Sequence, residues 1–344
     1  MRNFPVKNLT EWYKGSARDL PWRQTPDPYR VWVSEIMLQQ TRVEAVKGYY
    51  ARFLKRFPDV RSLAGADEGE LLKLWEGLGY YSRARNMKRA AQRIMTDFSG
   101  KFPSSYEELL SLPGIGPYTA GAVASIAFGV PVPAVDGNAV RVISRFLADA
   151  SAGDVLKAGV TGFLESCIPK REPGLFNQAL MDLGATVCLP SGAPLCEKCP
   201  LAGSCVARSS GTQTDYPVRT VKPVRKVEKK TVFVLLSDGV PYGLKRPDTG
   251  LLASLYQLPE AEGFLSGPEA AAFISGHGLI PSGEIRVSHR KHIFTHVEWQ
   301  MRVYCVAVLT ASGSALPKEW ILLDREKHSL PTAYRICLPE EPEN

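Results

Sequence analysis

Two acidic residues stand in stretches of sequence that otherwise favour burial. Glu35 is the only acidic residue between Pro28 and Val43, within the apolar run VWVSEIML. Asp136 lies in PVPAVDGNAV, also among apolar residues. Burial raises the pKa of a carboxyl group, which makes Glu35 a candidate proton donor near neutral pH. One protonated and one ionised carboxyl group is the arrangement that cleaves glycosidic bonds.

Each carboxyl group also has a structural alternative. Glu35 could pair with a buried arginine, such as Arg30, Arg42 or one farther along the chain. Asp136 precedes GNAVRVISRFL and could cap the helix that this stretch predicts. Capping and catalysis are compatible, because a carboxylate at a helix start ionises easily and can still face a positive centre.

A two-glycine turn separates two predicted helices in LPGIGPYTAGA. Gly114 and Gly116 permit positive φ angles and the close approach of another backbone. Pro117 suits the first position of the second helix, whose free N–H groups could bind a phosphate. The alternative is a plain hairpin of two helices with no ligand.

Four of the seven cysteines lie close together in CLPSGAPLCEKCPLAGSC. This density predicts a metal or an iron–sulfur cluster, and the spacing alone does not decide between iron and zinc. The three other cysteines, Cys167, Cys305 and Cys337, are expected to be packing residues. The four candidate ligands are Cys188, Cys196, Cys199 and Cys205.

An aromatic pair, Tyr80 and Tyr81, stands beside several basic residues in GLGYYSRARNMKR. Aromatic rings next to basic side chains suit a wedge in stacked bases with phosphates held nearby. Packing in the core is the alternative for either tyrosine.

The elements that must position these residues divide the 344-residue chain into two parts. Residues 1–210 carry helical periodicity, with a break predicted near Thr41 and a capping box formed by Ser105 and Glu108. Residues 211–230 are polar and basic and predict a linker. Residues 231–344 predict several strands and one helix, a small α+β domain.

Composition limits the class of protein. The chain is 44% hydrophobic and 22% charged, which is typical of a soluble globular protein. It has no apolar run of membrane-spanning length and no signal-peptide core at its start, so we expect an intracellular protein. The net charge of +7 is compatible with binding to a polyphosphate, although a solvated basic surface would give the same value.

Together these motifs resemble the helix–hairpin–helix DNA glycosylases, and within them the MutY adenine DNA glycosylases. The resemblance covers nearly the whole chain. It implies a mainly α N-terminal region of two helical lobes. One lobe has six helices over about 25–130, and the other, which carries the cysteines, is formed by the N-terminal segment together with 131–210. It also implies a Nudix-like C-terminal domain. The motifs that carry it are LPW, VWVSEIMLQQT, WEGLGYYSRARN, LPGIGPYTAGA, VDGN, FNQALMDLGATVC, RPDTGLLASLYQLP and HIFTH.

The resemblance implies a monofunctional enzyme that hydrolyses the N-glycosidic bond of adenine opposite 8-oxoguanine or guanine in duplex DNA. Glu35 would protonate the base, and Asp136 would face the positive sugar. Tyr118 and Asn138 would position the sugar and the carboxyl groups. The DNA contacts implied are those of Gly114, Gly116, Gln40, Thr41, Leu78, Tyr80 and Arg18.

Two departures from the family pattern stand out. The lesion-reading motif is Phe294-Thr295-His296, where serine is usual in the middle, and seven residues rather than six separate Cys188 from Cys196. The resemblance still implies a [4Fe–4S] cluster, with zinc kept open, and a domain that recognises 8-oxoguanine without hydrolysing a nucleotide, because 256–278 lack the glutamate-rich metal box. It further implies a monomer without a membrane partner, cytoplasmic in a prokaryote and nuclear or mitochondrial in a eukaryote.

Two other functions fit parts of the sequence. An endonuclease III-like lyase shares the hairpin, the aspartate and the cluster, but it needs a lysine where this chain has Tyr118. A catalytically silent lesion-binding protein would share the fold, but it would not need both Glu35 and Asp136.

Overall fold

The computed structural model describes residues 4–218, 224–312 and 315–339. The chain divides into two compact units: residues 1–66 with 85–222, and residues 67–84 with 223–344. In these described ranges, every helix is too short or too polar to cross a membrane.

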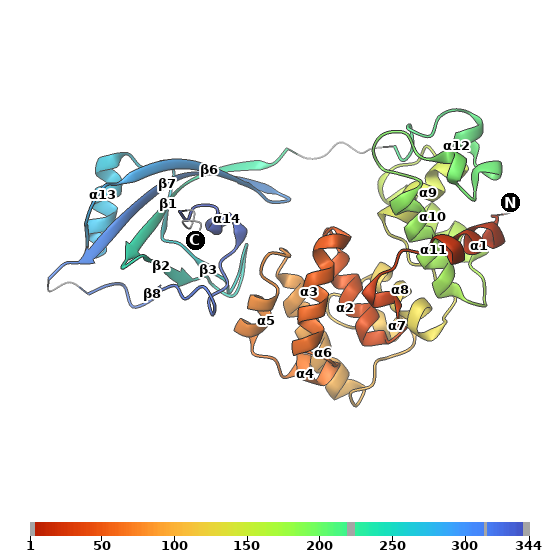
Figure 1. Cartoon of the computed structure of the whole chain (residues 1–344), viewed down its shortest axis with the longest axis horizontal. Coiled ribbons are helices and arrows are strands. Elements are labelled where there is room, and N and C mark those ends of the chain that lie inside the picture. Colours follow the sequence, from red (N-terminus) through yellow and green to blue (C-terminus); the bar gives the residue numbers. More distant parts are fainter. Residues whose placement is uncertain (1–3, 219–223, 313–314, 340–344) are drawn as a thin grey trace. The chain divides into compact units, whose positions relative to one another are not determined.

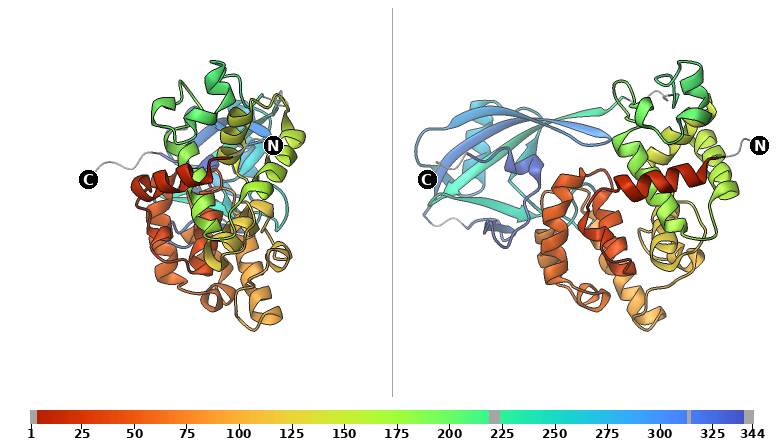
Figure 2. Two further views of the ribbon diagram at one scale, coloured as in Figure 1. Left: turned by 90° about the vertical axis from the view of Figure 1, so that its right-hand side faces the viewer. Right: turned by 45° about the vertical axis from the view of Figure 1, so that its right-hand side comes forward.

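The first unit is helical and contains two groups of helices (Figure 1). In one group α1 packs with α9, α10 and α11 around a core that includes Leu9, Phe146 and Phe176. In the other, α2 packs against α3 and α8, and α8 also contacts α11. Figure 2 shows α1, in dark red, lying along the helices that follow residue 136, although more than a hundred residues separate them.

Several helices begin at residues that favour a helix start. Proline begins α2, α8 and α11, and the predicted capping box of Ser105 and Glu108 is present at the start of α7. The predicted break near Thr41 separates α2 from α3. The helices described in residues 4–218 are α1 (Val6–Ser16), η1 (Pro21–Arg23), α2 (Pro28–Leu38), α3 (Val43–Arg56), α4 (Val60–Ala64), α5 (Glu68–Leu74), α6 (Ser82–Asp97), α7 (Tyr106–Leu110), α8 (Pro117–Phe128), α9 (Gly137–Leu147), α10 (Gly153–Cys167), α11 (Pro173–Thr186), η2 (Cys196–Lys198), η3 (Ala202–Ser204) and α12 (Val206–Ser209).

The second unit is built on a mixed sheet in the strand order β3-β2-β1-β7-β5. The central strands β1 and β7 are parallel, with Lys226 opposite Val297 and Leu236 opposite Ala307. β6 pairs antiparallel with β7, β4 with β1, and β8 with β2. The strands and helices are β1 (Lys226–Ser237), β2 (Val240–Lys245), β3 (Tyr256–Gln257), β4 (Glu260–Glu262), α13 (Gly267–Gly276), β5 (Leu279–Pro281), β6 (Arg286–Ile293), β7 (Val297–Thr310), β8 (Trp320–Leu322) and α14 (Thr332–Arg335).

The alternation of side chains along β1 gives the sheet two buried faces. Phe233 faces α13 and stacks on Phe273 with ring centroids 4.1 Å apart. Val232 and Val234 face the other way, into a core shared with Tyr334 of α14. This arrangement agrees with the α+β class predicted from the sequence.

Two boundaries differ from the sequence prediction. The linker was predicted over 211–230, but β1 begins at Lys226 because its residues pair in register with β7, some seventy positions later. Residues 219–223 of that linker lie outside the described residues. The segment 67–84 belongs to the second unit, where Glu76 Oε1 lies 3.3 Å from Arg335 Nη1.

Candidate active site

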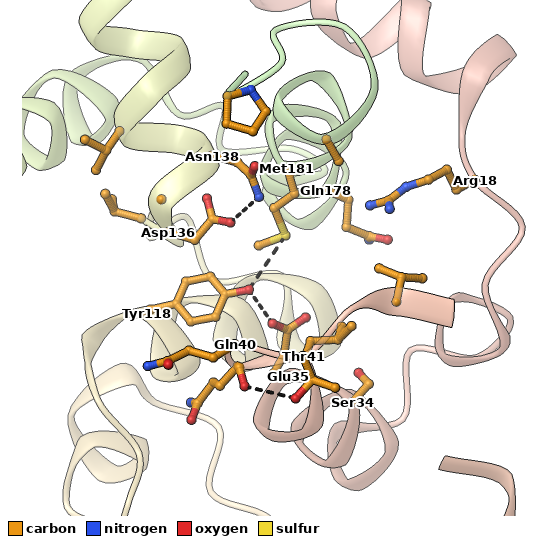
Figure 3. Close-up of a pocket in the computed structure, with 18 of the residues that line it drawn as sticks. Arg18, Ser34, Glu35, Gln40, Thr41, Tyr118, Asp136, Asn138, Gln178 and Met181 are labelled. Carbon is orange, nitrogen blue, oxygen red and sulfur yellow. Dashed lines mark hydrogen bonds between the residues drawn. The ribbon is translucent and has the colours of Figure 1, made fainter. Parts of the chain in front are cut away.

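A cavity of about 1240 Å³ opens in the first unit, and α2, α8, α9 and α11 supply its walls (Figure 3). It brings together Glu35, Tyr118, Asp136 and Asn138, which the sequence analysis proposed as the catalytic group. The four residues come from three helices, and the chain separation between Glu35 and Asn138 exceeds one hundred residues. The fold therefore assembles this group from distant segments.

Glu35 is buried on α2, with only 5% of its surface exposed. Its helix is buried on nearly every side, and its neighbours along the chain, Trp32, Val33 and Ile36, are buried as well. Burial raises the pKa of Glu35 to about 7, against a hydrogen bond from Tyr118 that lowers it. The charge of Asp136 raises this pKa further, and the charge of Arg23 lowers it. Glu35 can therefore give up a proton at neutral pH.

Glu35 has a nearby arginine charge, but the arginine is neither of the two named as candidates. Neither Arg30 nor Arg42 forms an ion pair with Glu35 among the described residues. Arg23 acts on it only through its charge, since both of its terminal nitrogens bind Asp182 at 2.7 Å. The nearest hydrogen-bond partner of Glu35 is the Tyr118 hydroxyl, which also lies 4.0 Å from Met181 Sδ.

Asp136 caps α9, as one of its two alternatives predicted, and it also faces the cavity, where the catalytic alternative would place it. Its side chain accepts hydrogen bonds from the Ala139 backbone N–H at 2.7 Å and from Asn138 Nδ2 at 2.6 Å. Burial raises the pKa of Asp136 above its ordinary value, and these two donors together with the Arg141 charge limit that rise. Because these donors favour the ionised form, Asp136 is the better candidate for the carboxylate of the pair.

Arg141 holds Asn138 in place. Its guanidinium donates to Asn138 Oδ1 and to the Gly184 carbonyl oxygen, each at 2.8 Å. It also donates to the Cys188 carbonyl oxygen at 2.8 Å. A Cβ atom at Gly184 would lie 2.5 Å from Asn138 Cβ, so glycine is required for α11 to come this close.

The two glycines of the hairpin have different roles. Gly114 has φ +77° and packs so tightly on Asn86 that a Cβ atom would clash at 2.6 Å. Gly116 has φ −97° and therefore does not use the positive φ angles that glycine permits. It is instead the N-cap of α8, with open space where a side chain would be, which leaves the helix start accessible.

The residues proposed to contact DNA fall into separate places. Gln40, Thr41 and Arg18 line the cavity with Glu35, and Gln40 has a positive φ of 56°. Arg18 is also bound to the buried Asp182, with Nε 2.8 Å from Oδ1. Its charge is therefore partly committed inside the protein, which the sequence did not reveal.

Of the aromatic pair, only one ring is accessible. Tyr80 is 46% exposed and adopts φ +47°, whereas Tyr81 is buried at 7%. The core alternative thus describes Tyr81. Tyr80 keeps an accessible ring, and its hydroxyl lies 3.0 Å from the Thr295 hydroxyl oxygen, within hydrogen-bond distance. Leu78 is buried at 6%, so in this conformation it is not placed to enter a stack of bases.

Phe294, Thr295 and His296 form the turn between β6 and β7. Phe294 packs edge-on against Trp299 at 4.8 Å, and its N–H donates to the Val297 carbonyl oxygen at 2.8 Å. Thr295 and His296 are exposed. Phe294 thus anchors a turn whose two other side chains are polar and exposed.

Several residues of the cavity wall were not identified from the sequence. Gln178 and Met181 reach the cavity from α11, and Asp182, one turn after Gln178, is fully buried. The sequence did contain a signal for Asp182, because it is a charged residue in the otherwise apolar helix FNQALMDLG. A buried aspartate without a partner is costly, so this position predicts a positively charged partner. Leu38, Trp22 and Arg23 line the cavity as well.

Comparisons with known proteins identify both parts of the chain. Residues 33–155 match the HhH-GPD superfamily base excision DNA repair proteins, and residues 231–340 match the NUDIX domain. An adenine DNA glycosylase of Mus musculus is 32% identical over 372 residues, which cover 90% of this chain and 72% of that protein. The adenine DNA glycosylase of Buchnera aphidicola subsp. Baizongia pistaciae is 36% identical over 258 residues, covering 74% and 73% of the two chains.

The chain belongs to the adenine DNA glycosylase family.

Solved structures agree with this assignment at the level of the fold. A thermostable thymine-DNA glycosylase superposes with a TM-score of 0.55 at 31% identity, covering 60% of this chain and 95% of that one. Endonuclease III, in a trapped covalent intermediate with DNA, gives 0.51 at 25% identity with the same coverage. This adenine DNA glycosylase family member thus shares the helical architecture of the endonuclease III-like glycosylases.

Four thiols of this family member line one small, largely apolar cavity. Cys188, Cys196, Cys199 and Cys205 share it with Arg145, whose Nη1 lies 3.3 Å from Cys188 Sγ. Within the described residues, no three Cys, His, Asp or Glu side chains are arranged to hold a single metal ion. A single zinc would need sulfur atoms about 2.3 Å from its centre. Four thiols are a donor set that either a zinc ion or an iron–sulfur cluster takes in proteins.

The three remaining cysteines pack in the two cores, as predicted. Cys167 contacts the core of α9, α10 and α11, while Cys305 and Cys337 contact the core beside α14. Burial raises the pKa of Cys167 to about 11 and that of Cys337 to about 12, so both thiols stay protonated.

Proposed function

We propose that this chain removes adenine paired with 8-oxoguanine, and with guanine, by hydrolysing the N-glycosidic bond and leaving an abasic site. One observation carries the proposal: a buried glutamate with a pKa of about 7 and a donor-stabilised aspartate face the same cavity. The cavity is large enough for an extruded nucleotide, and enzymes that act on a base take it out of the stack.

The two carboxyl groups divide the reaction between them. Glu35 donates its proton to a ring nitrogen of adenine, and the electrons of the C1′–N9 bond leave with the base. Asp136 stabilises the positive charge that develops on the sugar. Water then adds to C1′, and its released proton returns to Glu35, so the enzyme is regenerated.

Tyr118 favours hydrolysis over strand cleavage. A lyase of this fold needs an amine at this place to attack C1′, and a phenol hydrogen-bonded to Glu35 is not such a nucleophile. Strand breaks should therefore appear only after the abasic product is treated with alkali.

The first test is adenine release from an end-labelled duplex with one A:8-oxoguanine pair, under single-turnover conditions. Glu35→Gln should abolish release and keep lesion binding, because glutamine cannot donate the proton. Asp136→Asn keeps a helix-capping oxygen and should also abolish release. Release by both variants would overturn the assignment, and breaks without alkali would replace hydrolysis by lyase chemistry.

We also propose that the Phe294–His296 turn reads 8-oxoguanine. Thr295 is exposed, and its hydroxyl pairs with the Tyr80 hydroxyl at 3.0 Å, a bond that it would exchange for one to the lesion's edge. The packed Phe294 ring fixes the turn. Thr295→Ala should reduce the preference for A:8-oxoguanine over A:G, and Thr295→Ser should retain it. An unchanged preference in the alanine variant would assign the reading to another segment.

The donor set of four thiols supports a [4Fe–4S] cluster held by Cys188, Cys196, Cys199 and Cys205. When bound, such a cluster would cross-link the loop that follows α11. Arg145 lies beside this loop, with its Nη1 2.8 Å from the Leu189 carbonyl oxygen. Iron and sulfide should be found at about four atoms each per chain. Zinc in their place would overturn the assignment.

The hairpin and Tyr80 are proposed to bind the DNA around the lesion. The open N-terminus of α8 can bind a phosphate through its free N–H groups, and the exposed Tyr80 ring can stack on a base. Replacing Gly116 by aspartate would place a negative charge in that open space. Duplex affinity should then fall without loss of the fold.

A further inference from the structure

Gln178 is the one amide side chain that α11 places on the wall of the cavity (Figure 3). A carboxamide has a donor end and an acceptor end of similar shape, so its orientation decides which base edge it can recognise. Its Oε1 accepts a hydrogen bond at 3.1 Å from the Tyr13 hydroxyl. Among the described residues, Gln178 Nε2 has no hydrogen-bond partner in the protein.

Tyr13 is built into the fold rather than placed on its surface. It lies on α1, is 5% exposed, and reaches Gln178 from 165 positions away. Burial raises its pKa, so the phenol keeps its proton and remains able to donate. Among the described residues, the hydroxyl of Tyr13 has one hydrogen-bond partner, Gln178.

Two arginines set the direction of the hydrogen bond. Arg23 lies over the Tyr13 ring at 5.5 Å, and Arg18 and Arg23 share the single carboxylate of Asp182. This group carries a net charge of +1 beside the phenol. A positive charge attracts the lone pairs of the phenol oxygen and directs its proton away, toward Gln178. The amide oxygen is thereby held against α1, and the amide NH₂ is left for the cavity.

We infer that Tyr13 is a positioning residue that fixes the Gln178 carboxamide with its NH₂ toward the extruded base, so that the site selects a purine edge with an unprotonated ring nitrogen. The inference rests on the proposed function, since it concerns how that adenine is recognised. Adenine offers ring-nitrogen acceptors at N1 and N3. If the NH₂ meets N1, a base that carries N1–H would meet it donor to donor; if it meets N3, the contact orients the purine in the site. An unpaired buried donor costs more than the lost hydrogen bond alone.

The test is a double-mutant cycle on single-turnover adenine release. Tyr13→Phe keeps the ring and frees the carboxamide to rotate, and it should slow release about fivefold to tenfold, the equivalent of one hydrogen bond. Gln178→Met removes the amide at similar volume. In that background Tyr13→Phe should have no further effect, because the residue acts only through the carboxamide.

Substrate analogues locate the nitrogen that is read. The wild-type chain should be slowed by either 1-deazaadenine or 3-deazaadenine, and the Tyr13→Phe effect should disappear on that same analogue. The matched control is Tyr29→Phe, which removes another buried hydroxyl bond, to the Phe57 carbonyl oxygen at 2.8 Å, away from the cavity. It should lower the melting temperature as Tyr13→Phe does, without changing discrimination between analogues.

The outcomes separate the two claims. Equal slowing by Tyr13→Phe in the wild-type and Gln178→Met backgrounds would show a merely structural role and overturn the inference alone. No slowing in the wild-type background would overturn it as well. Absence of adenine release by the wild-type chain, folded and bound to the duplex, would overturn the proposed function and the inference with it.

Discussion

Removing the Tyr118 hydroxyl should shift the pH dependence of adenine release to higher pH. With Glu35 as the general acid, the single-turnover rate should be constant below its pKa of about 7 and fall tenfold per pH unit above it. The Tyr118 hydroxyl stabilises the ionised form of Glu35, and so lowers that pKa. Tyr118→Phe should therefore raise it.

The size of the shift follows from the buried hydrogen bond. A hydrogen bond to a charged group contributes about 1.5 to 3 kcal/mol, and one pKa unit corresponds to about 1.4 kcal/mol. The descending limb should thus move up by about one to two pH units. At pH 8 the wild-type chain would hold about one-tenth of Glu35 protonated, and the variant at least half.

The assay is the single-turnover rate across pH 5 to 10 on the A:8-oxoguanine duplex, with enzyme in excess. The midpoint is independent of the plateau, so a slower variant still reports it. Tyr29→Phe, which loses a buried hydroxyl outside the cavity, should keep the midpoint near 7. A midpoint in Tyr118→Phe identical to that of the wild type would refute Glu35 as the titrating acid or the hydrogen bond as its regulator.

Three other predictions concern stability, packing and binding. The raised pKa of Glu35 means that the folded chain binds a proton more tightly than the unfolded chain, so the free energy of unfolding falls as pH rises from about 4.5 to 7. In urea unfolding at pH 8, Glu35→Gln should therefore be more stable than the wild type by up to about 3 kcal/mol. Equal stability of the two would contradict a cost of burying the Glu35 carboxylate. Gly184→Ala should slow adenine release and destabilise the fold by about 1 to 3 kcal/mol, since its Cβ would displace Asn138. An unchanged rate of adenine release would show that the reaction does not depend on the position of Asn138. Tyr80→Ala should weaken binding to mismatched duplex about tenfold or more in a titration, whereas Tyr80→Phe should retain it.

The two carboxyl groups of the cavity could be singled out from the sequence because each breaks a local rule, whereas Tyr118 and Asn138 were implied only by the family resemblance. Glu35 is an acid in an apolar helix, and Asp136 combines a capping position with an apolar setting. Both are local patterns that one window of sequence reveals. The same holds for Gly114, whose positive φ is a property of its own turn.

The residues that escaped prediction act through distant partners. Nothing near Tyr13 indicates that it meets Gln178, and Arg18 looks like a free cation until Asp182 is placed beside it. Likewise β1 begins inside a basic, polar stretch because β7 supplies its hydrogen bonds. Tertiary pairing decides these cases, and a local pattern does not contain it.

The contacts of Arg141 connect the cysteine loop to the proposed catalytic aspartate. One guanidinium holds the backbone of Cys188 and the amide of Asn138, which in turn holds Asp136. If the cysteine loop loosened for want of its metal group, that restraint on the aspartate would loosen too. Under the proposed [4Fe–4S] assignment, a chain made without its cluster would then release adenine more slowly, because the cluster loop would no longer restrain Asp136 through Arg141 and Asn138.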